Sequence, residues 1–294
     1  MFAQLQAAKS LLIHQKKLEN FGEINEYFYG RKCLEIGGPS SIFQPNSFLP
    51  LYPILKSIDN VNFSNTTVWK KGLIASVLQK NWVQKQFVLD ATNLAGIKEE
   101  SYDCVLSSHV LEHIANPLRA LFEWRRILKV GGILLLILPH KSATFDRNRE
   151  VTKCNHLLQD YENGVDEHDL SHLAEILNLH DLSIDPEAKS SENFAMRSKN
   201  NFDNRCLHHH VFVTESAICI MNQAELKVLT IMTHLPFHII IVGKKLTATT
   251  NNQKEELHHH NLEFLRKDTS WRKQSCFELD KTILSKDFCA ITEF

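Results

Sequence analysis

Short apolar runs alternate with amphipathic stretches through the middle of the chain. Between two of these runs, Asn116 and Pro117 provide a helix N-cap and a first helical residue, and Gly131 with Gly132 ends the same helix. Apolar runs that alternate with helices are typical of a parallel sheet covered on both faces. The runs predicted as strands cover residues 33–36, 55–58, 87–89, 102–106 and 133–138.

The ends of the chain and one internal segment follow other patterns. Apolar residues near a helical spacing predict a helical extension over residues 1–30. Residues 141–207 are polar and rich in Asp, Glu, His and Asn, which predicts an insertion that covers the end of the sheet. The C-terminal tail has mixed charge, and its best apolar cluster, around Leu262 and Phe264, predicts no more than a short helix.

Sheet patterning returns late in the chain. A helix is predicted over residues 214–224, and strands over 226–232 and 237–242 are joined by a short turn that fits an antiparallel hairpin. The predicted organisation is a helical extension at 1–30, a main domain at 31–244 with the cap insertion at 141–207, and a C-terminal appendage at 245–294.

The composition is that of a globular protein. Of 294 residues, 43% are hydrophobic and 23% are charged, which excludes a wholly disordered chain. The 33 basic and 34 acidic residues leave a net charge of −1, so no general attraction to nucleic acid or to an anionic membrane is expected. The longest apolar run, Ile133–Leu138, is too short to span a bilayer. We expect a cytoplasmic protein that acts on a small molecule, with neither nucleic acid nor membrane as partner.

Cysteine and histidine are the candidate metal ligands. The seven cysteines are dispersed without CxxC pairs, which is typical of reduced thiols and argues against a cysteine-rich zinc module. Neighbours in the histidine runs 208–210 and 258–260 point apart, so neither run is by itself a metal motif. His168 and His172 stand four residues apart and could present two ligands on one helix face, but a solvated polar helix edge is the favoured interpretation.

Candidate chemistry gathers where the predicted strands end. In a parallel sheet these ends share one edge, and ligands bind there. The first strand holds Glu35 and is followed by Gly37 and Gly38, which allow a ligand to approach the backbone closely. Asp59, about twenty residues later, can accept from ribose hydroxyls, and Asp90 can accept from an adenine amino group. In combination these residues predict an adenosine pocket.

Two segments carry a family resemblance. Residues 34–39 read LEIGGP and residues 107–132 read SSHVLEHIANPLRALFEWRRILKVGG, with the two aspartates between them. This pattern resembles the class I S-adenosylmethionine-dependent methyltransferases, in particular the methyltransferase type 11 core. The resemblance covers residues 32–140 well and residues 226–243 more loosely. It implies a Rossmann-like α/β fold with a seven-stranded sheet, an antiparallel C-terminal hairpin, and S-adenosylmethionine as cofactor.

The first motif departs from the family pattern, because Pro39 and Ser41 stand where the family usually has glycines. A dehydrogenase fits less well, since no glycine follows Gly38 until Gly72 and the dinucleotide fingerprint is absent. The cofactor-binding residues that the resemblance implies are Glu35, Gly37, Gly38, Pro39, Asp59, Asp90, Ala91 and Ser108.

Histidines at the strand ends are the candidate bases, because imidazole titrates near neutral pH. His109 and His140 are predicted to be catalytic, with simple pocket lining as the alternative for each. Glu112 and His113 are expected to orient and pack their loop. A resemblance to ubiquinone-type O-methyltransferases would place a divalent cation on His109, Glu112 and His113, but the favoured expectation is that no metal is bound.

The polar insertion is expected to select the acceptor. Its Arg147 and Arg149 are predicted to bind a phosphate or carboxylate on the substrate. We predict methyl transfer to a small polar acceptor, with an oxygen of a sugar or related metabolite as the best candidate. The alternative is a non-catalytic cofactor-binding or scaffold relative of the same fold. A nucleic-acid methyltransferase is disfavoured by the neutral charge and by the lack of an Asn/Asp-Pro-Pro-Tyr sequence after the fourth strand.

Overall fold

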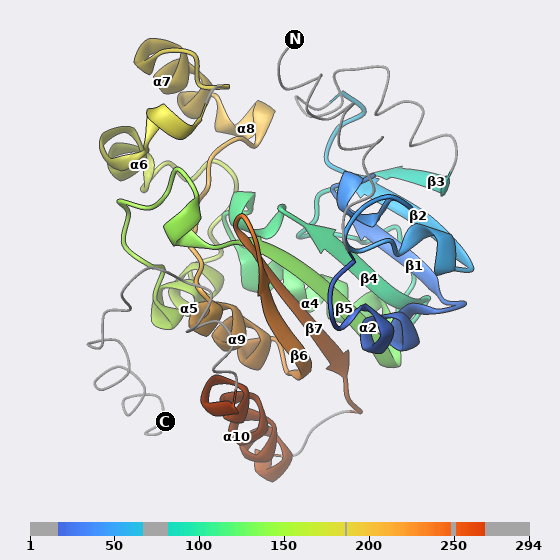
Figure 1. Ribbon diagram of the computed structural model, residues 1–294. Helices are drawn as coiled ribbons and strands as arrows, with labels where there is room; N and C mark the ends of the chain where they lie inside the picture. The colour runs from blue at the N-terminus through green and yellow to red at the C-terminus, as the bar shows by residue number, and fades with distance from the viewer. Residues whose placement is uncertain (1–16, 67–81, 186, 248–250, 268–294) are drawn as a thin grey trace.

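A single mixed sheet organises the part of the chain that the computed structural model describes, which comprises residues 17–66, 82–185, 187–247 and 251–267. Its seven strands follow the order β3-β2-β1-β4-β5-β7-β6, and β7 runs antiparallel to its neighbours (Figure 1). The predicted α/β fold with an antiparallel C-terminal hairpin is therefore confirmed. The strands are β1 Lys32–Ile36, β2 Ser57–Asn62, β3 Val83–Val88, β4 Tyr102–Ser108, β5 Leu128–Pro139, β6 Leu226–His234 and β7 His238–Lys245.

Helices cover both faces of the sheet. The predicted helix after Asn116 is α4, and the Asn116 side chain caps it by accepting from the backbone N–H of Arg119. The part of the predicted N-terminal helix before residue 17 lies outside the described residues. The described helices are α2 Phe21–Phe28, α4 Pro117–Ile127, α5 Cys154–Glu162, α6 Leu173–Leu179, α7 Ser191–Lys199, α8 Asn201–Asn204, α9 Thr214–Gln223 and α10 Asn251–Lys267.

Side chains along the strands alternate between the two faces, so each face has its own apolar cluster. On one face Leu34 packs in the cluster that contains Trp124 of α4 and residues of α9. On the other face Leu106 packs with Phe28 of α2 and with Tyr52. This arrangement buries most residues of the central strands β1, β4 and β5 and leaves the ends of the strands as the accessible edge.

The insertion at 141–207 forms α5, α6, α7 and α8. Helix α5 packs against α4 and α9, whereas α6 and α7 lie beyond the edge at which the parallel strands end (Figure 1). A small apolar cluster holds this outer part together, and its buried members are Ile176, Ala188, Phe194 and Leu207.

Strand β2 is longer than its apolar pattern predicts. The apolar pattern predicts that the strand ends at Asp59, but in the structure β2 continues through Asn62. The polar residues Asp59, Asn60 and Asn62 are all buried. The Asp59 carboxylate accepts a hydrogen bond from the Tyr102 hydroxyl at 2.7 Å, which satisfies a polar side chain inside the sheet.

Helix α10 covers the edge of the sheet at β6. The Asn261 side chain accepts from the Val228 N–H at 2.8 Å and donates to the Leu226 carbonyl at 3.0 Å. At 17 residues α10 is longer than the predicted short helix, because contacts with the sheet edge stabilise it in place of a strong apolar stripe of its own. No helix in the described ranges combines the length and the apolar character that crossing a membrane requires.

Among the cysteines that the structure describes, four are paired. Cys33 of β1 is joined to Cys104 of β4, and Cys154 of α5 to Cys219 of α9, with Cα–Cα distances of 4.6 and 6.3 Å. The prediction of unpaired thiols is wrong for these four residues, because elements far apart in the sequence pack side by side. Cys206 is a free thiol.

Candidate functional site

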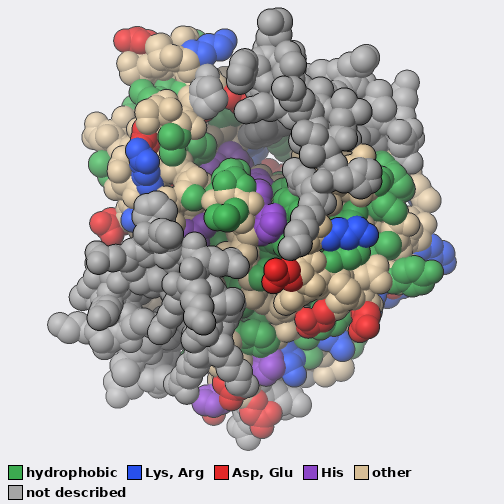
Figure 2. Space-filling view, in the orientation of Figure 1, with side chains coloured by type: hydrophobic (Ala, Val, Ile, Leu, Met, Phe, Trp, Pro, Cys, Tyr) green, Lys and Arg blue, Asp and Glu red, His purple; other side chains and the backbone are tan. Residues whose placement is uncertain are grey.

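A cavity of about 780 Å³ lies at the edge where the parallel strands end. Histidine side chains gather beside the hollow at the centre of the face shown in Figure 2. The strand ends contribute Gly37, Asn62, Asp90, Ser108 and Pro139. The insertion contributes Phe145, Glu167, Asp185 and Arg205, and the segment directly after it contributes His208.

The loop after β1 requires its two glycines for different reasons. Gly37 has a φ of +82°, and a Cβ there would lie 2.3 Å from the Val110 side chain. A Cβ on Gly38 would lie 2.0 Å from the carboxyl carbon of Glu35. The loop therefore packs tightly on both sides, and Gly37, Pro39, Ser40 and Ser41 line the cavity.

Glu35 supports this loop from below and does not line the cavity. Its carboxylate accepts from the Ser40 N–H at 2.9 Å and from the Tyr52 hydroxyl at 2.6 Å. Burial raises the pKa of Glu35 to about 7, and the two hydrogen bonds offset only part of this effect. Glu35 and Gly38, which were predicted to bind the cofactor, thus shape the loop beneath the cavity.

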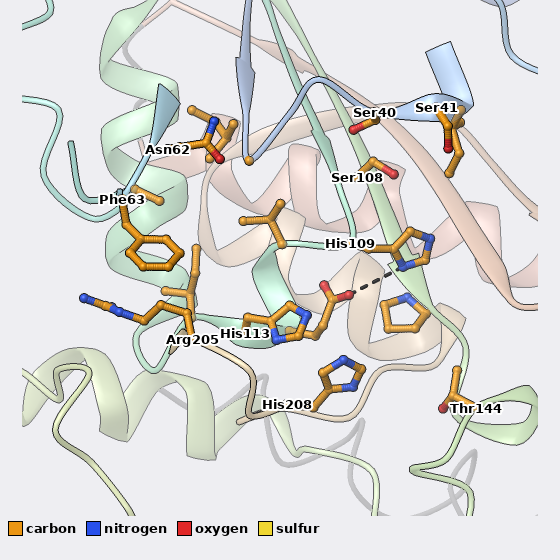
Figure 3. A pocket seen from close by; sticks show the side chains of 18 of the residues that line it. Ser40, Ser41, Asn62, Phe63, Ser108, His109, His113, Thr144, Arg205 and His208 are labelled. Atoms are coloured by element: carbon orange, nitrogen blue, oxygen red, sulfur yellow. Dashed lines mark ion pairs between the residues drawn. The ribbon is translucent and has the colours of Figure 1, made fainter. Parts of the chain in front are cut away.

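Asn62, and not Asp59, faces the cavity from β2. Asp59 is buried against Tyr102, away from the cavity wall, which does not agree with its predicted contact to a ribose. Asn62 donates to the Gly38 carbonyl at 2.9 Å and lines the cavity together with Val61 (Figure 3). The parallel register pairs Ile36 with Val61, so the position beside Gly37 belongs to Asn62. The hydrogen-bond register between β1 and β2 determines which residue of β2 faces the cavity, and the apolar pattern of the sequence does not contain this information.

Asp90, Ala91 and Ser108 all line the cavity, as their predicted contacts with a cofactor require. The Asp90 carboxylate accepts from the N–H of Thr92 at 2.8 Å and lies 3.3 Å from the Arg205 guanidinium. Asp90 is therefore held in place while it remains part of the wall.

Arg205 is a cavity residue that sequence reasoning missed. Its guanidinium lies 3.0 Å from a Glu167 carboxylate oxygen and 5.3 Å from the centre of the Phe63 ring (Figure 3). Nothing in the local pattern of the insertion distinguishes this arginine, because its partners come from segments far away in the sequence.

His109 lines the cavity and directly follows the last residue of β4. Its Nε2 lies 2.9 Å from His238 Nδ1, and its Nδ1 lies 3.4 Å from a Glu112 carboxylate oxygen (Figure 3). Burial and the proximity of His109 lower the pKa of His238 to about 3, so His238 is neutral. His109 thus contacts one carboxylate and one neutral imidazole, an arrangement that suits proton transfer.

A second group of side chains could hold a cation in the cavity wall. Ligand atoms of Glu112, His113 and His208 lie within 4.8 Å of one another. His113 Nδ1 lies 3.0 Å from the Leu207 carbonyl, and His208 Nδ1 lies 2.5 Å from a carboxylate oxygen of Asp146 (Figure 3). Of the three cation ligands that the resemblance suggested, Glu112 and His113 belong to this group, and His208 stands in the place of His109. The expectation of no metal stays a prediction.

His140 lies outside the cavity wall formed by the described residues. Its Nδ1 accepts from the Ser142 N–H at 3.3 Å and caps the turn Lys141–Ala143. This position does not agree with its predicted catalytic role.

Arg147 and Arg149 are also absent from the described cavity wall. Arg149 is buried, and its guanidinium donates to Asp146 at 2.8 Å, to Glu175 at 3.0 Å and to the His208 carbonyl at 2.8 Å. Arg147 pairs with Asp181 on the surface. Contact of either arginine with a substrate does not agree with these positions, because both side chains are engaged elsewhere.

Comparison with known proteins agrees with the fold. Residues 60–136 match the family model described as a methyltransferase domain, and no curated protein matches the chain. The matched segment lies within the residues that carry the sequence resemblance, so residues 60–136 are similar to a methyltransferase domain. The seven-stranded sheet agrees with the fold that this resemblance implies.

Three solved structures illustrate the likeness. An S-adenosylmethionine-dependent methyltransferase from Aquifex aeolicus is 11% identical, over 78% of this chain and 90% of that chain, with a TM-score of 0.42. A possible histamine N-methyltransferase from Thermotoga maritima is 20% identical, over 82% and 95%, with a TM-score of 0.43. The N-methyltransferase NodS from Bradyrhizobium japonicum is 12% identical, over 78% and 96%, with a TM-score of 0.43.

The packing of the first loop predicts the effect of a single methyl group. Gly38→Ala is expected to lower the free energy of unfolding by about 1–3 kcal/mol, because its Cβ would overlap the buried Glu35 carboxyl. Gly22→Ala is the matched control, since Gly22 lies in α2 with no heavy atom within 4 Å of the new Cβ, and it is expected to be neutral or stabilising. Urea unfolding of both variants measures the difference; equal stabilities would contradict the tight packing at Gly38.

The raised pKa of Glu35 predicts a pH dependence of stability. Its folded-state pKa of about 7 exceeds the ordinary value of 4.5, so the folded state binds the proton more tightly than the unfolded state. The contribution of Glu35 therefore lowers the free energy of unfolding as pH rises from about 5 to about 8, by about 2 kcal/mol. Urea unfolding at both pH values should show this loss in the wild type and not in Glu35→Gln. The same loss in both proteins would show that Glu35 does not titrate in this way.

Proposed function

We propose that this protein transfers a methyl group from S-adenosylmethionine to a hydroxyl oxygen of a small polar acceptor, such as a sugar or a related metabolite. The observation that carries the proposal is that one cavity joins the cofactor-type strand ends at Gly37, Asn62 and Asp90 to the imidazole of His109. Its volume of about 780 Å³ lies within the range of small-molecule sites.

The cofactor side of the cavity is formed by backbone and short polar groups. The left-handed turn at Gly37 removes side-chain bulk beside the Asn62 amide, and the Asp90 carboxylate can accept hydrogen bonds from a nucleoside. S-adenosylmethionine supplies an already activated methyl group, so the residues of this chain mainly position the two reactants.

The acceptor side requires a group that takes the proton of the hydroxyl. The Glu112 carboxylate beside His109 Nδ1 favours the tautomer with the proton on Nδ1, which leaves Nε2 as the proton acceptor. In this tautomer the neutral His238 donates to Nε2, and we propose that the acceptor hydroxyl takes over this position. Methyl transfer to the hydroxyl oxygen, with S-adenosylhomocysteine as the leaving group, would release the hydroxyl proton, and His109 Nε2 would accept it.

The insertion side of the cavity supports a polar acceptor. Glu167, Asp185, Glu187 and Arg205 line it, and their oxygen and nitrogen atoms suit hydroxyl groups better than an apolar surface. Phe145 and Phe237 contribute apolar area between these polar groups. The acceptor is therefore proposed to be small, rich in hydroxyls and partly enclosed.

Measurements of S-adenosylmethionine binding by single variants distinguish the roles of three polar residues. Asp90→Ala and Asn62→Ala are each expected to weaken S-adenosylmethionine binding by about tenfold or more, because each removes a polar group from the cavity wall. Asp59→Asn should leave the affinity nearly unchanged, since this side chain faces Tyr102. Isothermal titration calorimetry measures all three. Loss of binding in Asp59→Asn alone would contradict the assigned cavity wall.

The proposed base predicts a defect in turnover without a defect in cofactor binding. His109→Asn is expected to lower kcat for hydroxyl acceptors by about 10²–10⁴-fold, with the S-adenosylmethionine affinity retained. His168→Asn is the control, because His168 is exposed and lies outside the cavity. A radiolabelled methyl-transfer assay over a panel of sugars and polyols provides the measurement. Cofactor binding without turnover on any acceptor would favour the non-catalytic alternative.

A further inference from the structure

A second cluster of metal-ligating side chains lies outside the cavity, on the inner side of the insertion. His156 and Asp160 stand one turn apart on α5, and His172 immediately precedes α6. His210 comes from the segment that leads into α9. None of the four side chains belongs to the cavity wall of the described residues, so the cluster is separate from the proposed methyl-transfer site.

The ligand atoms of His156, Asp160 and His210 lie within 4.8 Å of one another, and His172 contacts the His156 member of this group. His156 Nε2 lies 3.0 Å from His172 Nε2 and 3.4 Å from Asp160 Oδ2. Asp160 Oδ2 in turn lies 3.8 Å from His210 Nε2. Four ligands at zinc bond lengths of about 2.0–2.1 Å stand about 3.3 Å apart at the corners of a tetrahedron. The observed spacings fall on either side of this value.

Asp160 and His210 are buried, whereas His156 and His172 are half-buried. Among the described residues the buried Asp160 Oδ2 has no hydrogen-bond partner, so this ligand atom is unsatisfied without a cation.

We propose that His156, Asp160, His172 and His210 bind one divalent transition-metal ion, and that this ion is zinc. Three imidazoles and one carboxylate favour zinc over magnesium, which prefers a shell made of oxygen ligands. His210 would exchange its 3.2 Å contact with the Ala115 carbonyl for the metal. His172 would complete a tetrahedron by turning its Nε2 from His156 toward the ion, and four protein ligands would give the ion a structural role.

The position of the site explains what the ion would stabilise. The ion would connect α5, the start of α6 and the segment before α9. Glu175 lies 3.7 Å from His172 Nδ1 and accepts from Arg149, which also donates to the His208 carbonyl. A metal at this point therefore fixes the same segment that presents His208 to the cavity. Carboxylates next to metal-binding imidazoles commonly orient the ring in this way.

The test is metal binding by the full chain, purified without an affinity tag and stripped of metal by a chelator. Competition titration with Zn²⁺ is expected to show one tight site, and Co²⁺ substitution should give the absorption spectrum of a tetrahedral centre. Asp160→Asn and His172→Asn should each weaken Zn²⁺ binding by more than about tenfold. Zn²⁺ should raise the thermal unfolding temperature of the wild type and not of these two variants.

Two control variants locate the site. His168→Asn removes an exposed histidine of the same insertion and should leave Zn²⁺ binding unchanged. Glu112→Gln alters the other cluster, in the cavity wall, and should also leave it unchanged. The proposal is overturned if no tight site is present, if both cluster variants retain it, or if Glu112→Gln abolishes it. Binding of S-adenosylmethionine is measured separately, so failure of the metal site leaves the proposed methyl transfer untouched.

Discussion

The hydrogen-bond register of the central parallel strands is the constraint on which the site depends. It places Ile36 opposite Val61 on one side and opposite Ser107 on the other. The next residue on each strand is therefore Gly37, Asn62 or Ser108, and all three open into the cavity. A shift of one residue in any of these pairings would turn a cavity-lining side chain to the opposite face of the sheet. Groups that lie 71 residues apart, such as Gly37 and Ser108, thus become neighbours through backbone pairing alone.

The insertion completes the cavity through buried charges and hydrogen bonds more than through apolar packing. Its apolar cluster is small, whereas Arg149 is enclosed by two carboxylates and by backbone carbonyls. A buried guanidinium is tolerated only with such complete pairing, so its partners are fixed in orientation. Asp146 pairs with Arg149 and also holds His208. The orientation of a cavity-lining imidazole therefore depends on a network that contains no residue of the sheet.

Much of the fold could be predicted from the pattern along the chain. The helix that begins at Pro117, the strand that leads to Gly37 and the C-terminal hairpin all carry local signals, because capping, glycine placement and apolar periodicity act over a few residues. Strand β2 shows where such signals end. Asp59 and Asn62 are polar residues that the sequence pattern assigns to a loop. In the structure they are buried in a strand, because Asp59 is hydrogen-bonded to Tyr102 and Asn62 to the Gly38 carbonyl, both from other segments.

The amino-acid sequence by itself determined the class of fold, and it predicts the cofactor and the role of His109, since all three follow from a continuous motif at the strand ends. The tertiary structure determined which polar side chains lie together in the cavity wall and in the second histidine cluster. It brought Arg205 to Asp90, His208 to Glu112, and His210 to Asp160, and it directed Arg149 and His140 away from the cavity. The reason is physical. Periodicity reports whether a residue is buried, but the partner of a buried polar group is chosen by packing between segments that lie far apart along the chain.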